Sequence, residues 1–159
     1  MSLAEAPIVD GTSATPVQNV LFIMCDQLRW DAISCSGQAL IDTPNIDRLA
    51  GRGVRFDRAF VQGAVCGSSR MSYYTGRYVQ THGSRWNNVP LQVNQETLGD
   101  HLKPLGVRSV LIGKTHMTAD ADGLRRLGLA PGAAEWIFAS ECGFEPEERD
   151  DGLHPEFLK

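Results

Sequence analysis

The chain has 159 residues, of which 42% are hydrophobic and 21% are charged, and its formal net charge is −4 at pH 7. This length is sufficient for a single domain with a hydrophobic core, and the composition is that of an ordinary globular protein. The chain lacks the basic surplus that is typical of nucleic-acid binding, so we expect no nucleic-acid partner.

The first 18 residues contain two prolines and no apolar run. They fit neither a signal peptide nor a membrane helix, so we expect a flexible tail over residues 1–18 and no membrane partner. The four cysteines lie far apart and form no Cys-x-x-Cys pair, which argues against a disulfide framework and a structural zinc site. This pattern favours a reducing compartment, and we therefore expect a cytoplasmic location.

Residues 19–25 form a mostly apolar run without charge, which predicts a strand buried on both faces in a parallel sheet. Asp26 and Gln27 follow directly. Ligands gather beyond the carboxyl ends of strands in open α/β sheets, and two oxygen-bearing side chains there can hold a hard divalent cation. The alternative is that Asp26 caps a turn and Gln27 is solvated.

The next predicted elements lead the chain to a single cysteine. A helix over residues 43–50 is indicated by a capping Thr43, by Pro44 at the first helical position and by an apolar face. Residues 54–61 alternate imperfectly between apolar and polar side chains, which predicts a second strand. This strand delivers the chain to Cys66.

A second helix is expected to start at Cys66, because nothing between positions 68 and 74 breaks a helix and Gly76 suits its end. Ser68 or Ser69 can cap the first turn. The unpaired N–H groups at such an end favour a sulfate, phosphate or phosphonate group, and Arg70 can lean back toward the same place. The pattern therefore indicates anion chemistry.

The polar segment over residues 78–90 is the kind of loop that lines a site. His82 in this loop is predicted to be a hydrogen-bonded structural residue. After it, residues 96–105 predict a helix with Leu98, Leu102 and Leu105 inward and His101 on its surface.

A third buried strand is predicted over residues 107–112, and Lys114 and His116 follow it. In an extended segment the i, i+2 spacing puts both side chains on one side, where they could reach a single oxyanion. The alternative is a surface lysine and a histidine in a turn. From residue 118 to the end the periodicity fades and acidic residues accumulate, so we expect a solvated loop, including Glu141, rather than a metal cluster or further regular elements.

These motifs together resemble the sulfatase family of the alkaline-phosphatase superfamily, which includes phosphonate monoester hydrolases, arylsulfatases and choline sulfatases. The resemblance is carried by Cys-x-x-x-Arg from Cys66 to Arg70 with Thr-Gly-Arg after it, by Asp-Gln at positions 26 and 27, and by Gly-Lys-x-His ending at His116. Two positions depart from the family pattern. Ser68 stands where proline or alanine is usual, and Tyr74 stands where leucine is usual.

The resemblance implies an α/β fold with a mainly parallel sheet flanked by helices, and a metal-dependent hydrolase of sulfate or phosphate/phosphonate esters. Its cofactors would be a divalent metal ion (calcium, manganese or magnesium) and a formylglycine made by oxidation of the cysteine. By the same resemblance, Asp26, Gln27 and Cys66 would be metal ligands, and Cys66, Arg70, Lys114 and His116 would be catalytic. Asn87 and Lys114 would contact the substrate, a small-molecule sulfate or phosph(on)ate ester.

The resemblance also implies that residues 19–159 are the amino-terminal part of a larger catalytic domain, so the rest of that domain would be a partner. A homo-oligomer is left open. Because the oxidising enzyme reads the proline that Ser68 replaces, one alternative is a catalytically silent domain that binds an anion or a partner through an unmodified Cys66. Another is a redox thiol at a helix N-terminus.

Overall fold

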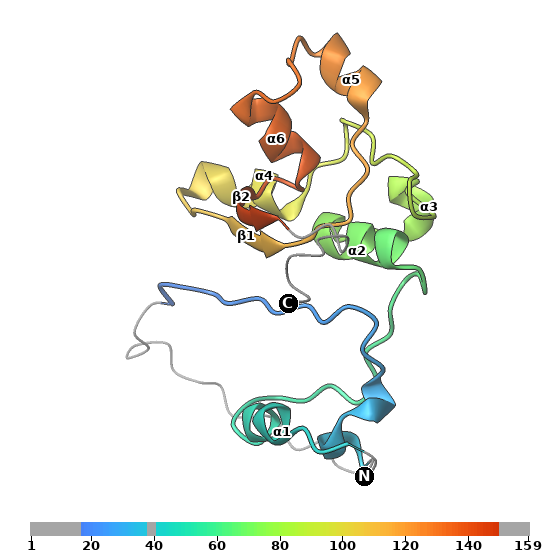
Figure 1. Cartoon of the computed structure of the whole chain (residues 1–159), viewed down its shortest axis with the longest axis vertical. Helices are drawn as coiled ribbons and strands as arrows, with labels where there is room; N and C mark the ends of the chain where they lie inside the picture. The colour runs from blue at the N-terminus through green and yellow to red at the C-terminus, as the bar shows by residue number, and fades with distance from the viewer. Residues whose placement is uncertain (1–16, 38–40, 150–159) are drawn as a thin grey trace, which may run out of the picture.

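The structure is a computed structural model that describes residues 17–37 and 41–149. The predicted tail lies outside the described residues except for Val17 and Gln18, and so does the end of the acidic segment. Figure 1 shows two regions, one with most of the helices and both strands and one that is largely irregular. We call residues 17–37 and 41–65 the arm, and residues 66–149 the body.

The body contains most of the regular elements. Its helices are α2 (Cys66–Thr75), α3 (Val79–His82), α4 (Leu98–Leu102), the 3-10 helix η3 (Lys103–Leu105), α5 (Ala121–Arg126) and α6 (Ala134–Ser140). Its strands are β1 (Val110–Gly113) and β2 (Glu145–Arg149). Among the described residues, each helix is too short or too polar to cross a membrane.

The sheet is parallel and has two strands, with Val110 opposite Glu145 and Leu111 opposite Pro146. Parallel pairing requires a long crossover, and here the crossover contains α5 and α6. The predicted α/β class, with a parallel sheet flanked by helices, is therefore confirmed (Figure 1). The solvated loop predicted after residue 118 is wrong, because this segment forms α5, α6 and β2.

The core lies where α2 meets the segments that follow it. Its buried members are Met71, Tyr74, Leu91 and Cys142. Phe144 packs against this cluster, with its ring edge-on to Tyr74 at a centroid distance of 5.6 Å. Burial raises the pKa of the Cys142 thiol far above its usual range, so this cysteine is a packing residue rather than a reactive thiol.

Residues 19–25 do not form the predicted buried strand. Their backbone has no strand partner among the described residues, and Val20 and Leu21 are 83% and 85% exposed. Alternate side chains nevertheless face the body: the ring of Phe22 lies 5.0 Å from that of Tyr73, and Met24 packs against the core. The apolar run therefore has the period of a strand but lacks the neighbours that would bury it.

The rest of the arm contains the short 3-10 helices η1 (Trp30–Ala32) and η2 (Ser34–Ser36) and the helix α1 (Pro44–Ala50). The predicted helix over residues 43–50 is confirmed, although the Thr43 side chain does not cap it. Its hydroxyl instead bonds Ser34, whose own hydroxyl donates to Asp47 at 2.6 Å. The second predicted strand, over residues 54–61, is wrong because this segment is irregular and exposed.

The predicted helix over residues 96–105 is split. Its α-helical part begins after Thr97, which forms a capping box with Asp100, and ends at Leu102 before the 3-10 turn that contains Pro104. His101 is on the surface as predicted. The prediction that Leu98 and Leu105 point inward is wrong, because they are 39% and 75% exposed.

Candidate functional site

The carboxylate of Asp26, in the arm, lies between two cations of the body. Arg70 Nη2 is 3.1 Å from one of its oxygens, and Lys114 Nζ is 2.8 Å from the other. The hydrogen bonds from Lys114 and then from Arg70 lower the pKa of Asp26, because they stabilise its charged form. We call Asp26, Arg70 and Lys114 the ion-pair cluster.

Arg70 is the centre of this cluster because its side chain is buried while its guanidinium has donors in two directions. Nη2 faces Asp26, and Nη1 donates to the backbone carbonyl of Lys114 at 2.8 Å. One residue of α2 therefore holds the arm and the segment after β1 together. A buried guanidinium needs such partners, since an unpaired buried charge is strongly destabilising.

Cys66 is the first residue of α2, as predicted, but the capping of the helix differs from the prediction. The cap position is Val65, and Ser68 Oγ donates to the Val65 carbonyl, so neither predicted serine caps the helix. The Gly67 N–H donates to Asn87 Oδ1 at 2.9 Å. One of the amide groups that the sequence suggested for an anion is therefore already bonded.

Asn87 also approaches the thiol, with its Nδ2 4.0 Å from Cys66 Sγ. Glycine at position 67 leaves room for the Asn87 side chain, because a Cβ there would lie 2.8 Å from Asn87 Oδ1. Asn87 and Cys66 are 21 positions apart in the chain, so the loop after α2 folds back over the start of the helix. The structure thus brings Asn87 to the cysteine.

Two predicted site residues have left-handed backbone conformations, which are uncommon for residues other than glycine. Gln27 has φ 55°, and its side chain is exposed in the turn that ends the apolar run. His116 has φ 57°, so the segment from Lys114 to His116 is not extended. The predicted i, i+2 alignment of the Lys114 and His116 side chains is therefore wrong, because it assumes an extended backbone.

The donor set for a divalent cation is chemically suitable but small. Asp26 and Gln27 supply oxygen ligands, and a carboxylate that accepts two hydrogen bonds keeps further lone pairs for a metal. A calcium ion needs six to eight oxygen ligands. Within the described residues there is no group of three or more His, Cys, Asp and Glu that could hold a metal ion. Any complete metal shell needs donors beyond these.

A buried pair that sequence reasoning missed lies behind the cluster. Thr115 Oγ1 donates to Glu141 Oε2 at 2.6 Å, and both residues are buried. The predicted solvated loop includes Glu141, and for this residue the prediction is wrong because Glu141 is only 6% exposed. No sequence signal distinguishes this glutamate from its exposed neighbours, because its burial depends on the packing of α6.

His82 is a structural residue, as predicted. It is buried, its Nδ1 accepts the Ser84 N–H at 3.1 Å, and its Nε2 lies 3.0 Å from Ser72 Oγ. Burial lowers its pKa. Since Nδ1 is an acceptor, the neutral ring carries its proton on Nε2 and donates it to Ser72.

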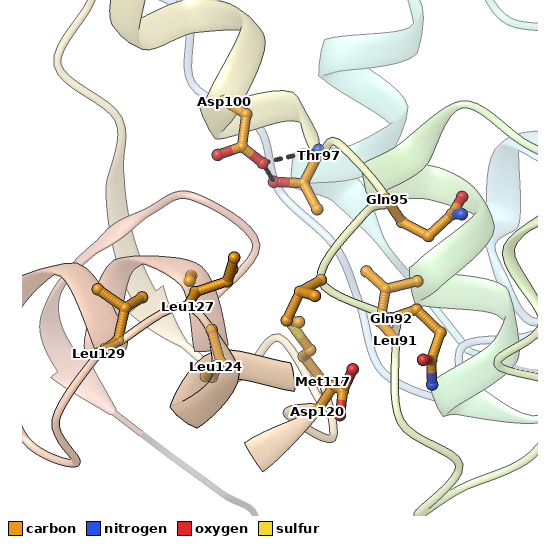
Figure 2. Close-up of a pocket in the computed structure, with 12 residues that line it drawn as sticks. Leu91, Gln92, Gln95, Thr97, Asp100, Met117, Asp120, Leu124, Leu127 and Leu129 are labelled. Atoms are coloured by element: carbon orange, nitrogen blue, oxygen red, sulfur yellow. Dashed lines mark hydrogen bonds between the residues drawn. The ribbon is translucent and has the colours of Figure 1, made fainter. Parts of the chain in front are cut away.

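The cavity in Figure 2, of about 100 Å³, lies in another part of the body. Its wall includes leucines at positions 91, 124, 127 and 129, and its polar edge includes the Thr97–Asp100 capping box. None of the ion-pair cluster lines it. Its apolar wall and carboxylates do not suit an anion.

Comparisons with known proteins agree with the motifs. The family model described as Sulfatase matches residues 18–127. The chain is 32% identical to an N-acetylglucosamine-6-O-sulfatase of Bacteroides thetaiotaomicron over 86% of its own length and 24% of that relative. It is similar to the crystal structure of a phosphonate monoester hydrolase of Agrobacterium radiobacter, with a TM-score of 0.68, 30% identity, and coverage of 84% of this chain and 26% of that one.

A second solved structure holds its substrate, D-glucosamine-2-N,6-O-disulfate, and is similar with a TM-score of 0.54 and 35% identity over 58% of this chain and 19% of the other. The chain thus spans about a quarter of the length of the curated relative and of the hydrolase. These relatives also have the alkaline-phosphatase-like fold expected from the motifs. Because the family model covers more than half of the sequence, this chain belongs to the sulfatase family.

Proposed function

We propose that this chain contributes the nucleophile side of an active site that hydrolyses sulfate or phosphonate esters. The observation that carries the proposal is the meeting of Asp26, Arg70 and Lys114 from three distant segments. Two fixed cations, one of them on the helix that starts at Cys66, are suited to a tetrahedral oxyanion. The relatives named above act on sulfate or phosphonate esters according to their descriptions.

In this proposal Cys66 is the precursor of a formylglycine nucleophile, and Asp26 and Gln27 are the first ligands of a calcium, manganese or magnesium ion. Such an ion would lower the pKa of a ligated hydroxyl and offset negative charge. Arg70 holds the modified residue and balances charge, and Lys114 binds the ester oxygens. Asn87 is supported as a substrate contact by its position beside the thiol.

His116 completes the proposed set as the residue that orients the nucleophile. Its side chain is partly buried, and it belongs to the same short segment as Lys114. The left-handed backbone at this position gives that segment a defined bend.

We further propose that the rest of a sulfatase domain is the partner of the arm. None of the described residues 17–37 and 41–65 is buried, although Leu21, Ile23 and Phe60 are large and apolar. An open cavity of about 200 Å³ between residues 59–62 and α2 has a mainly apolar wall. A reducing, cytoplasmic location is part of the proposal, and all four cysteines, which lie in the described residues, are free thiols.

A silent anion-binding domain is the second candidate, and Ser68 is the observation that favours it. Its buried hydroxyl bonds the Val65 carbonyl, so the helix start is stable without the family's proline. Cys66 would then stay a thiol at the start of α2.

Intact-mass measurement separates the two candidates. Conversion of Cys66 to formylglycine removes about 18 Da, and a Cys66→Ala variant must not show this loss while a Cys25→Ala variant must. Hydrolysis of aryl sulfate or phosphonate monoester by the full-length protein, dependent on added metal and lost in Cys66→Ala, is the expected result. An unmodified mass together with sulfate binding would support the silent domain instead.

A further inference from the structure

The segment from Gly113 to Met117 carries Lys114 out of β1 toward the ion-pair cluster. Gly113 is the last residue of β1, and residues 114–117 have no regular structure; Gly113 and His116 have positive φ angles, 100° and 57°. A left-handed residue other than glycine is unfavourable by roughly 1 kcal/mol, so surrounding contacts must hold this backbone in place.

Two contacts hold it from the side of the segment that follows α6. The first is the 2.6 Å hydrogen bond from Thr115 to the Glu141 carboxylate, with the two residues only 3% and 6% exposed. The second is the 3.5 Å contact between Cys142 Sγ and Met117 Sδ. Thr115 Oγ1 also accepts the Met117 N–H at 3.3 Å, which closes the turn locally.

A carboxylate is an expensive residue to bury if packing is all that is needed, because an apolar side chain would be more stable there. What a carboxylate adds is a strong, directional acceptor for the threonine hydroxyl. The Thr115 side chain is therefore fixed in direction as well as in depth. Its neighbours in the chain, Lys114 and His116, are fixed with it.

The consequence reaches the ion-pair cluster through the backbone of Lys114. Its carbonyl accepts from Arg70 Nη1 at 2.8 Å, and its ammonium donates to Asp26 at 2.8 Å. A shift of Thr115 would move both contacts at once. The chain of contacts therefore runs from Glu141 through Thr115 to Lys114, and from there to Arg70.

We propose that Glu141 is a positioning residue, which acts through Thr115 to hold Lys114 against Asp26 and Arg70. This inference deepens the proposed function, since it names what places the oxyanion-binding lysine. It does not require that Cys66 be modified or that the chain be active, because it concerns only the geometry of Lys114.

Lysine acetylation followed by mass spectrometry tests the inference without an activity assay. A lysine held in an ion pair reacts slowly, whereas a released one reacts as a surface lysine does. We expect Lys114 to react several-fold faster in Thr115→Val and Glu141→Leu than in the unchanged chain. Thr115→Ser, which keeps the hydroxyl, should restore slow reaction.

Glu135→Gln is the matched control, because Glu135 is an exposed glutamate on α6. Glu141→Gln, which keeps an acceptor oxygen, is a second variant if Glu141→Leu does not fold. Its Lys114 acetylation rate should lie between those of the unchanged chain and of Thr115→Val. Rates are compared only where circular dichroism shows the folded state. Slow acetylation of Lys114 in folded Thr115→Val would overturn the inference, whatever the melting temperature does. An unmodified Cys66 or an inactive full-length protein would overturn the proposed function alone.

Discussion

The arm and the body contribute to the same cluster but are held in different ways. The body has a core around Met71 and Leu91, and it supplies Arg70 and Lys114 to the cluster. The arm has no buried residue in its described part, yet it supplies Asp26. A member of the ion-pair cluster thus comes from a segment whose contacts with the body are made by three alternate side chains, Phe22, Met24 and Asp26, rather than by a core of its own.

The largest difference between the two regions should appear in the free energy of unfolding when a side chain is truncated to alanine. Met71→Ala removes a fully buried side chain and should lower the free energy of unfolding by about 2–5 kcal/mol. Val20→Ala, in the exposed arm, should change it by less than about 0.5 kcal/mol. Urea denaturation measures both, and equal effects would show that the arm is packed as tightly as the body.

Removal of the guanidinium that joins the regions should have the next largest effect. Arg70→Ala leaves the Lys114 carbonyl and Asp26 without these donors, and should lower the free energy of unfolding by about 1.5–3 kcal/mol. Arg70→Lys should restore little, since one ammonium cannot reach both acceptors with the same geometry. Arg58→Ala, at an exposed position in the arm, is the control, and a loss there of similar size would contradict the assignment.

The start of α2 offers a test of contact within the body. Gly67→Ala places a Cβ 2.8 Å from Asn87 Oδ1 and should destabilise the chain by about 1–3 kcal/mol. In an Asn87→Ala background the same substitution should be much milder, because the clashing atom is gone. A double-mutant cycle measures this coupling, and strictly additive effects would mean that Asn87 does not cover the helix start.

The docking of the arm should depend on alternate residues. Phe22→Ala removes the ring contact with Tyr73 and should weaken local docking by about 1 kcal/mol. Ile23→Ala, at the neighbouring exposed position, should have no such effect. Limited proteolysis within residues 17–37 measures this difference, and cleavage should be faster in Phe22→Ala only. Similar cleavage rates in both variants would show that alternate residues do not dock the arm.

The smallest effect concerns pH. The pKa of Asp26 is lowered in the folded state, so its ion pairs stabilise the fold above the ordinary carboxyl pKa of 3.8 and are lost as the pH falls through the lower folded value. Because the Asp26 side chain is 46% exposed, solvent screening limits the contribution to less than about 1 kcal/mol. Asp26→Asn should flatten the acid limb of the stability profile below pH 4, and an unchanged limb would contradict the lowered pKa.

Sequence reasoning succeeded where the signal is local and failed where burial needs neighbours. The helix that starts at Cys66 and ends before Gly76 was predictable, since Gly76 adopts the left-handed conformation that ends a helix. The strand predicted over residues 19–25 was not formed, because apolar period alone does not supply hydrogen-bond partners. The sequence does not predict the elements after residue 118, because their apolar faces are short and the glycine, proline and acidic residues among them obscure the periodicity.

By itself, the sequence determined the family, the motifs and the order of the chemical groups, since each depends on residues within a few positions of one another. Only the tertiary structure decided three hydrogen bonds between distant positions. Lys114 bonds Asp26, 88 positions away; Asn87 bonds Gly67, 20 positions away; and Glu141 bonds Thr115, 26 positions away. The physical reason is that a hydrogen bond between distant segments forms only after the core has brought them together. No local pattern of residues encodes that distance.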